Sequence, residues 1–492
     1  MKYPSLLITL FLSTVIFAQT DQEKVEATVS KGDIEGHIYF LSDDLLKGRE
    51  TGTPENKIAA SYLANTFRRH GVKPNPLTND YYQEVPLQAI TPPKNSTLSV
   101  EGKEYTNKVV LNASKINYTG DAIYIGYGLE KDYQNINVEG KVVLIKAGGP
   151  DAKDARSAFG LRGKKMELAK KAGALAIIEY INAAPQIWSY IDHNFNSQRL
   201  EISQSKNQNS KETPFSYVWV QDINETHAAS FTPKKKYPIQ LTMQEESLEI
   251  IRTQNVVGIV EGTDPQLKDE YIIYSAHYDH VGIGQPDKTG DTIYNGARDN
   301  AVGVTTVLSM AENLAAYPTK RSALFILFTA EEKGLLGSEF YTQNPIVPLE
   351  QMVYCFNSDN GGYNDTSIAT IVGLTRTTAE ENIKNAAAAF GLQAMEDPAP
   401  EQGLFNRSDN VHFARKGIPS PTFSLGFTDF SKITTYYHRP NDEADTLDYD
   451  YLLKFFKAYV LSGRNIANDS STPFWVSGDP YESAGKKLYN KQ

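Results

Sequence analysis

Side chains that bind metal ions recur in the second half of this sequence, and each group follows an apolar run or a glycine-flanked turn. Residues 277–280 read His-Tyr-Asp-His, residues 331–332 are a pair of glutamates, and residues 357–359 read Asn-Ser-Asp. Asp299 lies between the first two groups, and His438 supplies another imidazole far downstream. Imidazole and carboxylate ligands without thiolates suit zinc best. The pattern therefore indicates metal chemistry.

Two divalent ions that lie close together need a shared carboxylate and further ligands on each side. The sequence contains such a set, with Asp299 as the shared ligand, His277 and Asp359 for one ion, and Glu332 and His438 for the other. We therefore expect a site for two Zn2+ ions, with Co2+ or Mn2+ as alternatives.

Two further carboxylates have expected roles beside these ligands. Asp279 stands close enough to His277 in sequence to accept its second ring N–H and so hold the tautomer. Glu331 would stay off the metal and act as the general base toward the attacking water. His280 belongs to the same motif as His277, but we expect it to have a structural role beside the cleft.

Each of these signals has an ordinary structural explanation when it is taken alone. A His-x-Asp pair is often incidental, adjacent glutamates usually lie on a solvated face, and an aspartate at a strand end is often a cap or turn residue. A single histidine such as His438 is more often a surface residue. Their shared position after apolar runs and glycine-flanked turns makes coincidence the weaker explanation.

The elements that must position these residues follow from the apolar pattern. Apolar runs predict strands over Tyr271–Ala276, Ala323–Phe328 and Met352–Phe356, and helical spacing predicts helices over Ala301–Tyr317 and Gly334–Tyr341. Such alternation is typical of an α/β sheet whose parallel strands are buried on both faces. Ligands of these sheets bind at the carboxyl ends of the strands, so the metal-binding groups would meet in one cleft.

Length and composition restrict the remaining possibilities. A chain of 492 residues exceeds what one hydrophobic core normally organises, so we expect more than one domain. The net charge of -10 argues against nucleic acid as a partner, and a single cysteine, Cys355, excludes a disulfide framework. Residues 1–18 match a secretory signal peptide, and no later apolar run would span a membrane. The mature protein is therefore expected to be exported, to a periplasm or to the outside.

At this point the motifs resemble those of a known family, the M28 metallopeptidases, which are dizinc exopeptidases. The motifs that carry the resemblance at the metal site are Ser275–Asp279, Gly296–Asn300, Ala330–Ser338, Asn357–Asp359 and Tyr437-His438. Further matches are Gly48–Gly52, Arg407–Asp409, Gly417–Pro419 and Pro440–Asp445. A middle stretch is similar to the protease-associated (PA) domain often inserted in this family, through Ile125–Gly128, Gly140–Ile145 and Ala172–Ile178.

The resemblance implies a mixed, mostly parallel sheet sandwiched by helices, with an inserted β-rich PA domain. The implied boundaries are a signal peptide at 1–18, the peptidase domain at 19–100 and 249–470, the PA domain at 101–248, and a tail at 471–492. The implied activity is release of amino-terminal residues from peptides with a free N-terminus, through a water that bridges the two metals. Tyr437 would hydrogen-bond the developing oxyanion, or alternatively would satisfy a backbone carbonyl.

Two residues depart from the usual family pattern. Arg298 stands where relatives more often have an acidic residue, which would place a cation beside the carboxylate of Asp299. Residues 360–362 read Asn-Gly-Gly, where Met, an apolar residue and Gly are more usual. Both departures keep every metal ligand and would act on the shape of the pocket.

Other functions remain open on the sequence alone. A carboxypeptidase or a glutaminyl cyclase-like enzyme would share much of the metal motif. A binding protein that has lost its metals, as in transferrin receptors, would keep the architecture but not the ligands, and here all five ligands and Glu331 are present. A serine hydrolase is disfavoured because the chain contains no Gly-x-Ser-x-Gly motif.

Overall fold

The computed structural model describes residues 19–151, 155–203 and 214–490, and the expected signal peptide lies outside these residues. The chain folds into two compact units, Met1–Val85 with Thr253–Gln492, and Pro86–Arg252. The PA domain expected at 101–248 lies within the second of these units, and the identity of that unit as a PA domain stays a prediction. Among the described residues, none of the helices combines the length and the apolar character needed to cross a membrane.

Strands β18 to β11 of a nine-stranded sheet organise the first unit. Its order is β18-β17-β19-β16-β12-β15-β11-β1-β8. Strands β15, β12, β16 and β19 run parallel to their neighbours within this group, whereas β11 runs antiparallel to β15 and β17 antiparallel to β19. The strands are β1 (Tyr82–Thr91), β8 (Arg199–Ile202), β11 (Ser247–Val260), β12 (Tyr271–His277), β15 (Ser322–Phe328), β16 (Met352–Ser358), β17 (Ile368–Val372), β18 (Gln393–Glu396) and β19 (Thr422–Leu425). The expected mixed α/β sheet is confirmed.

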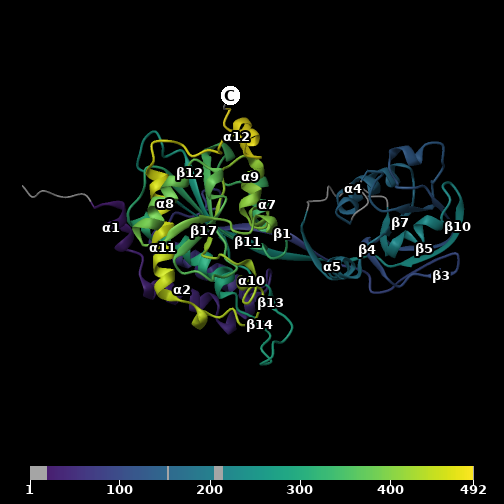
Figure 1. The fold of residues 1–492 in the computed structure, drawn as a ribbon, viewed down its shortest axis with the longest axis horizontal. Helices are drawn as coiled ribbons and strands as arrows, with labels where there is room; N and C mark the ends of the chain where they lie inside the picture. The colour runs from purple at the N-terminus through teal and green to yellow at the C-terminus, as the bar shows by residue number, and fades with distance from the viewer. Residues whose placement is uncertain (1–18, 152–154, 204–213, 491–492) are drawn as a thin grey trace, which may run out of the picture. The chain divides into compact units, whose positions relative to one another are not determined.

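Alternate side chains of the central strands enter two different cores, so helices cover both faces of the sheet. In β15, Phe325 and Leu327 belong to one core, and Leu324 and Ile326 to the other. Figure 1 shows helices α2, α8 and α11 on one side of the sheet and α7 and α9 on the other. The helices of this unit are α1 (Asp21–Glu26), α2 (Lys31–Leu41), α3 (Pro54–His70), α6 (Gly303–Ala316), α7 (Leu336–Gln343), α8 (Glu380–Ala389), α9 (Asn410–Lys416), α10 (Phe430–Ile433), α11 (Tyr449–Asn468) and α12 (Glu482–Leu488).

The observed elements lie close to those expected from the apolar pattern. The three expected strands correspond to β12, β15 and β16, each longer than expected by one or two residues at an end. The helix expected over Ala301–Tyr317 is α6, which starts later because a separate turn, η5 (Ala297–Val302), precedes it. That turn carries Asp299, so its irregular backbone has a direct bearing on the site.

The second unit contains an eight-stranded sheet with the order β3-β2-β10-β5-β6-β7-β9-β4. Its strands are β2 (Ser96–Val100), β3 (Lys103–Glu104), β4 (Lys108–Asn112), β5 (Ile116–Tyr124), β6 (Val142–Lys146), β7 (Ala176–Ile181), β9 (Ser216–Gln221) and β10 (Lys236–Met243), and its helices are α4 (Ala155–Lys171) and α5 (Pro185–Asn196). A buried Glu179 pairs with Lys165 and accepts hydrogen bonds from Tyr217 and Trp219. These contacts satisfy the buried charge and give it a structural role.

Candidate metal centre

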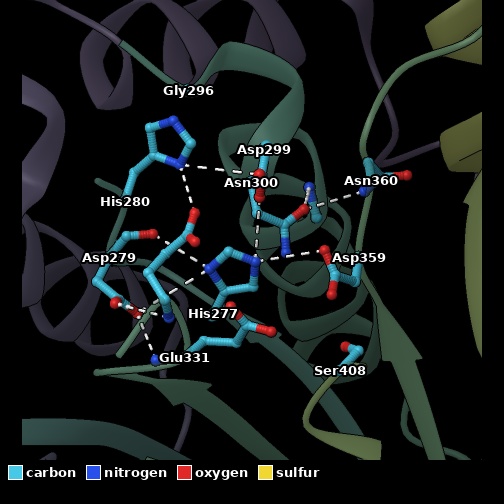
Figure 2. A network of polar contacts seen from close by, with 12 residues as sticks. His277, Asp279, His280, Gly296, Asp299, Asn300, Glu331, Asp359, Asn360 and Ser408 are labelled. Atoms are coloured by element: carbon cyan, nitrogen blue, oxygen red, sulfur yellow. Dashed lines mark hydrogen bonds and ion pairs between the residues drawn. The ribbon is translucent and has the colours of Figure 1, made fainter. Parts of the chain in front are cut away.

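The expected metal ligands of the first unit lie at the carboxyl ends of its parallel strands. His277 is the last residue of β12, Asp359 directly follows β16, and Glu332 lies in the turn that follows β15. Asp299 comes from η5, and His438 comes from the segment after α10. Because these strands are parallel neighbours, their ends meet at one edge of the sheet, where all five side chains converge (Figure 2 shows the part around Asp299).

One set of donor atoms surrounds the imidazole of His277. Its Nε2 atom lies 3.3 Å from Oδ1 of Asp299 and 3.3 Å from Oδ1 of Asp359. Glu331 joins His277 and Asp359 in a group whose donor atoms all lie within 4.8 Å of one another. This set places an imidazole and carboxylates at a spacing that suits a divalent ion.

A second set of donor atoms surrounds His438. Its Nε2 atom lies 3.1 Å from Oδ2 of Asp299 and 3.0 Å from Oε2 of Glu332. This nitrogen is shielded from solvent and, despite these short distances, makes no hydrogen bond of acceptable angle with a described residue. Donor atoms that converge without hydrogen-bond geometry are what a metal site requires. The residues therefore fit a divalent ion, and Asp299 offers one carboxylate oxygen to each set.

The Asp279 carboxylate has a different role from the one expected. Nδ1 of His277 lies 3.1 Å from the backbone oxygen of Asp279, whereas the Asp279 carboxylate is 4.0 Å away. The carboxylate instead accepts hydrogen bonds from the hydroxyl of Thr51 and from the backbone N–H groups of Glu331 and Glu332, at 2.9, 3.1 and 3.3 Å. The expected side-chain contact to His277 is thus wrong, because the backbone carbonyl already fills that position. Asp279 holds the Glu331-Glu332 turn in place, as Figure 2 shows.

His280 was expected beside the cleft, but it lies directly against the donor atoms. It is completely buried, and its Nδ1 atom lies 2.7 Å from Oε1 of Glu332 and 3.9 Å from Oδ2 of Asp299. The signal that would have found it is its place in the motif that ends β12, one residue after Asp279. A side chain at Gly296 would meet this imidazole at 2.6 Å, so the glycine lets the two segments approach.

Unusual backbone conformations accompany the site. Ala330, directly before Glu331, has φ 58°, and His438 has φ 53°. Non-glycine residues rarely adopt this left-handed region, and such conformations concentrate at functional sites where the surroundings impose them.

Charges in the site perturb each other strongly. Burial raises the pKa of Glu331 well above its usual range, and the neighbouring carboxylates of Asp359 and Glu332 raise it further. Burial also raises the pKa of Glu332, but the neighbouring imidazoles of His280 and His438 outweigh burial and lower this pKa to about 2. The two adjacent glutamates are therefore distinct: Glu332 is held as an anion, and Glu331 favours a proton.

Arg298 is directed away from the carboxylate of Asp299. Its guanidinium donates to Oδ1 of Asp442 at 2.9 Å and lies 3.8 Å from the ring centre of Tyr436. The same Asp442 accepts hydrogen bonds from the backbone N–H groups of Arg298 and Asp299. The expectation of a cation beside the shared carboxylate is therefore wrong. Arg298 instead links the turn that carries Asp299 to the segment that carries His438.

A pocket opens beside the donor atoms. Its wall contains His277, Asp299, Glu331, Asp359 and Tyr437 from the site, the apolar residues Val372, Leu404, Phe427, Phe430 and Ile433, and the polar residues Arg407, Ser408, Thr422, Ser424 and Thr434. Gly361 and Gly362, from the unusual Asn-Gly-Gly segment, also line it, whereas Asn360 is buried and donates to Oδ1 of Asn300 at 3.0 Å. Small residues at these positions leave room for a ligand.

Parallel strands that present imidazoles and carboxylates to such a pocket define a metal-dependent hydrolase of the α/β class. Comparison with known proteins makes this specific. Residues 255–461 match the model of peptidase family M28. Residues 255–461 therefore form a domain of peptidase family M28, and the protein is a metallopeptidase.

Curated relatives extend the likeness beyond that domain. Aminopeptidase YwaD of Bacillus subtilis (strain 168) is 24% identical over 431 residues, which cover 85% of this chain and 81% of the relative. The probable leucine aminopeptidase 2 of Aspergillus oryzae is 27% identical over 413 residues, which cover 77% of this chain and 73% of the relative. A solved aminopeptidase from Aneurinibacillus sp. strain AM-1 shares the fold, with a TM-score of 0.58 and 20% identity over 92% of this chain and 97% of that chain.

We predict that Arg298→Met weakens metal retention. Removing the guanidinium leaves the buried Asp442 without its charge partner, a change that costs about 3–5 kcal/mol in comparable buried pairs, and it frees the turn that holds Asp299. Metal content after dialysis, measured by elemental analysis, should fall relative to the wild type, together with the melting temperature. Arg415→Gln, which changes an exposed arginine of α9, serves as the control. Full metal content and an unchanged melting temperature in Arg298→Met would contradict the prediction.

Proposed function

We propose that this protein is a zinc-dependent aminopeptidase that removes amino-terminal residues from peptides. The observation that carries the proposal is the carboxylate of Asp299, whose two oxygens each face a separate set of donors. The curated relatives that are named aminopeptidases support the choice among peptidase activities.

In this proposal Asp299, His277 and Asp359 would hold one Zn2+ ion, and Asp299, Glu332 and His438 would hold the other. His280 contacts the other carboxylate oxygen of Glu332. Mixed imidazole and carboxylate donors suit zinc, with Co2+ or Mn2+ as alternatives. When bound, such a pair of ions supplies Lewis acidity to the substrate carbonyl and lowers the pKa of the attacking water.

Glu331 is the proposed general base. It lines the pocket next to His277 and Asp359. Burial raises its pKa, and cations bound beside it would lower that pKa again, so the ionised carboxylate could accept a proton from the water. As the water oxygen attacks the scissile carbonyl, the Glu331 carboxylate takes one water proton, and it delivers that proton to the departing amine when the C–N bond breaks. The hydrogen bond from the Glu331 backbone to Asp279 keeps this side chain on the pocket wall.

The carboxylates of the pocket also favour a substrate with a free amino terminus. Asp299 and Asp359 both line the pocket, so an α-ammonium group placed beside them meets opposite charge. A carboxypeptidase or a glutaminyl cyclase-like enzyme would use the same donors with a different substrate end, and a metal-free binding protein would bind peptide without cleaving it. We further propose export through the leader at 1–18, with 101–248 folded as a PA domain.

Substituting Glu331 and Asp299 should separate catalysis from metal binding. We expect Glu331→Gln to keep its metal but to lose about 10²–10⁴-fold in kcat, because the amide cannot accept the water proton. Asp299→Ala should instead lose the metal, since both donor sets lose their shared ligand. Metal analysis and release of leucine from a leucyl peptide measure the two effects, with the exposed Glu350→Gln as the matched control. Unchanged turnover in Glu331→Gln would remove this residue from the mechanism.

Tyr437 is the proposed hydrogen-bond donor to the oxyanion. It lines the pocket and stacks on the ring of His438, with 3.9 Å between the ring centres. Burial raises its pKa far above the ordinary value, so the hydroxyl keeps its proton for donation. Tyr437→Phe should lower kcat by about 10–10³-fold with little change in KM, as loss of a transition-state donor does. Equal kcat in the two proteins would show that the hydroxyl has only a structural role.

Peptides with free or blocked termini distinguish the proposed activity from its alternatives. We expect hydrolysis of peptides with a free N-terminus and an apolar first residue, because Phe427, Phe430 and Ile433 line the pocket. An N-acetylated peptide should resist cleavage, and a C-terminal amide should not prevent it. Mass spectrometry of the products, with and without a chelator, gives the measurement. Release of C-terminal residues, or cyclisation of N-terminal glutamine, would replace the proposal with one of the alternatives.

A further inference from the structure

One charged residue of the pocket has no part in the chemistry described so far. Arg407 lies between η9 (Leu404–Asn406) and α9, next to Ser408, and it lines the same pocket as His277 and Glu331. Among the described residues that line this pocket, it is the one that carries a guanidinium or ammonium group. Its side chain is exposed to solvent, in contrast to the buried donors beside it.

The Arg407 guanidinium is also without an acidic partner. Four other arginines of this unit form ion pairs: Arg298 with Asp442, Arg321 with Glu270, Arg376 with Asp479 and Arg464 with Asp21. Within the part of the chain that the structure describes, Arg407 forms no ion pair, and its side chain donates no hydrogen bond. Fold stability thus does not explain this cation, which remains available to a ligand in the pocket.

An anionic ligand could bind in the surroundings of Arg407 only with the help of its positive charge. Leu404 and Phe427 present apolar surface to the pocket, and Asp359 presents a carboxylate. A carboxylate entering such a pocket would lose hydration and meet repulsion, at considerable cost in free energy, unless a cation receives it. A planar guanidinium binds a carboxylate through two parallel hydrogen bonds, which makes arginine well suited to this task.

We propose that Arg407 binds a carboxylate of the substrate and thereby extends the specificity of the pocket beyond apolar residues. This inference rests on the proposed peptidase function. Two parts of a peptide supply such a group: the side chain of an acidic N-terminal residue, or the C-terminal carboxylate of a short peptide. Arg407 therefore acts as a specificity-determining residue, separate from the metal ligands and from Glu331.

Three peptides of nearly equal size test the proposal. Leu-Ala amide carries no carboxylate, Glu-Ala amide carries one on its first side chain, and Leu-Ala carries one at its C-terminus. The zinc-loaded enzyme is assayed with each peptide, and kcat/KM for a carboxylate peptide is divided by kcat/KM for Leu-Ala amide. We expect Arg407→Gln to lower this ratio by about 10–100-fold, which is the usual effect of losing a hydrogen bond to a charged group. Arg407→Lys should restore part of the ratio, because the charge returns without the paired geometry.

The peptide whose ratio falls identifies the source of the carboxylate. Arg415→Gln, which removes an exposed arginine of α9 outside the pocket lining, should leave both ratios as in the wild type. Equal effects of Arg407→Gln on all three peptides would overturn the proposal. High salt should narrow the difference between wild type and Arg407→Gln, since the contact is exposed.

Binding separates this proposal from the proposed reaction. Calorimetric titration of the same peptides into Glu331→Gln, with and without Arg407→Gln, requires no turnover. A loss of affinity confined to carboxylate peptides supports the Arg407 site even if the wild type fails to cleave Leu-Ala amide, in which case the peptidase proposal alone fails. If Arg407→Gln changes the affinity for none of the three peptides, the Arg407 site is ruled out while the peptidase proposal stays intact.

Discussion

The site depends on the carboxylate of Asp299, which lies between His277 and His438 and belongs to both sets of donor atoms. The two donor sets contain four acidic side chains, Asp299, Glu331, Glu332 and Asp359. Like charges repel strongly where water is scarce. Histidines on either side offset part of this repulsion, and bound cations would offset the rest. The backbone of Asp299 is fixed from outside by Asp442, whose own charge is neutralised by Arg298. Asp299 is therefore placed by a buried ion pair whose two residues lie outside the lining of the pocket.

The sheet gives this arrangement a rigid base. Strands β15 and β16 are buried along their full length and β12 from Ile272 onward, so their ends are held by packing on both faces. Arg49 adds a second restraint, because its buried guanidinium donates to the backbone oxygens of Leu41, Tyr278, Asn295 and Gly296. The N-terminal segment thereby joins the turn after β12 to the turn before Asp299, although these segments are far apart in sequence.

Residues next to the ligands divide the work of support. Asp279 holds the backbone of the two glutamates, and His280 holds the carboxylate of Glu332. The difference between Glu331 and Glu332 follows from these neighbours, since only Glu332 lies against two imidazoles. Adjacent residues of the same type thus acquire different proton affinities through their surroundings. That difference supports the proposal that Glu332 binds metal and Glu331 moves a proton.

The sequence by itself determined the strands, the family resemblance and the set of metal-binding side chains, because apolar periodicity and the order of motifs are local properties of the chain. Tertiary structure alone decided which atoms face which: the backbone of Asp279 rather than its carboxylate contacts His277, His280 lies against Glu332, and Arg298 pairs with Asp442. These choices depend on segments up to 144 residues apart, and on the direction in which packing turns each side chain. Spacing along a sequence carries no information about either.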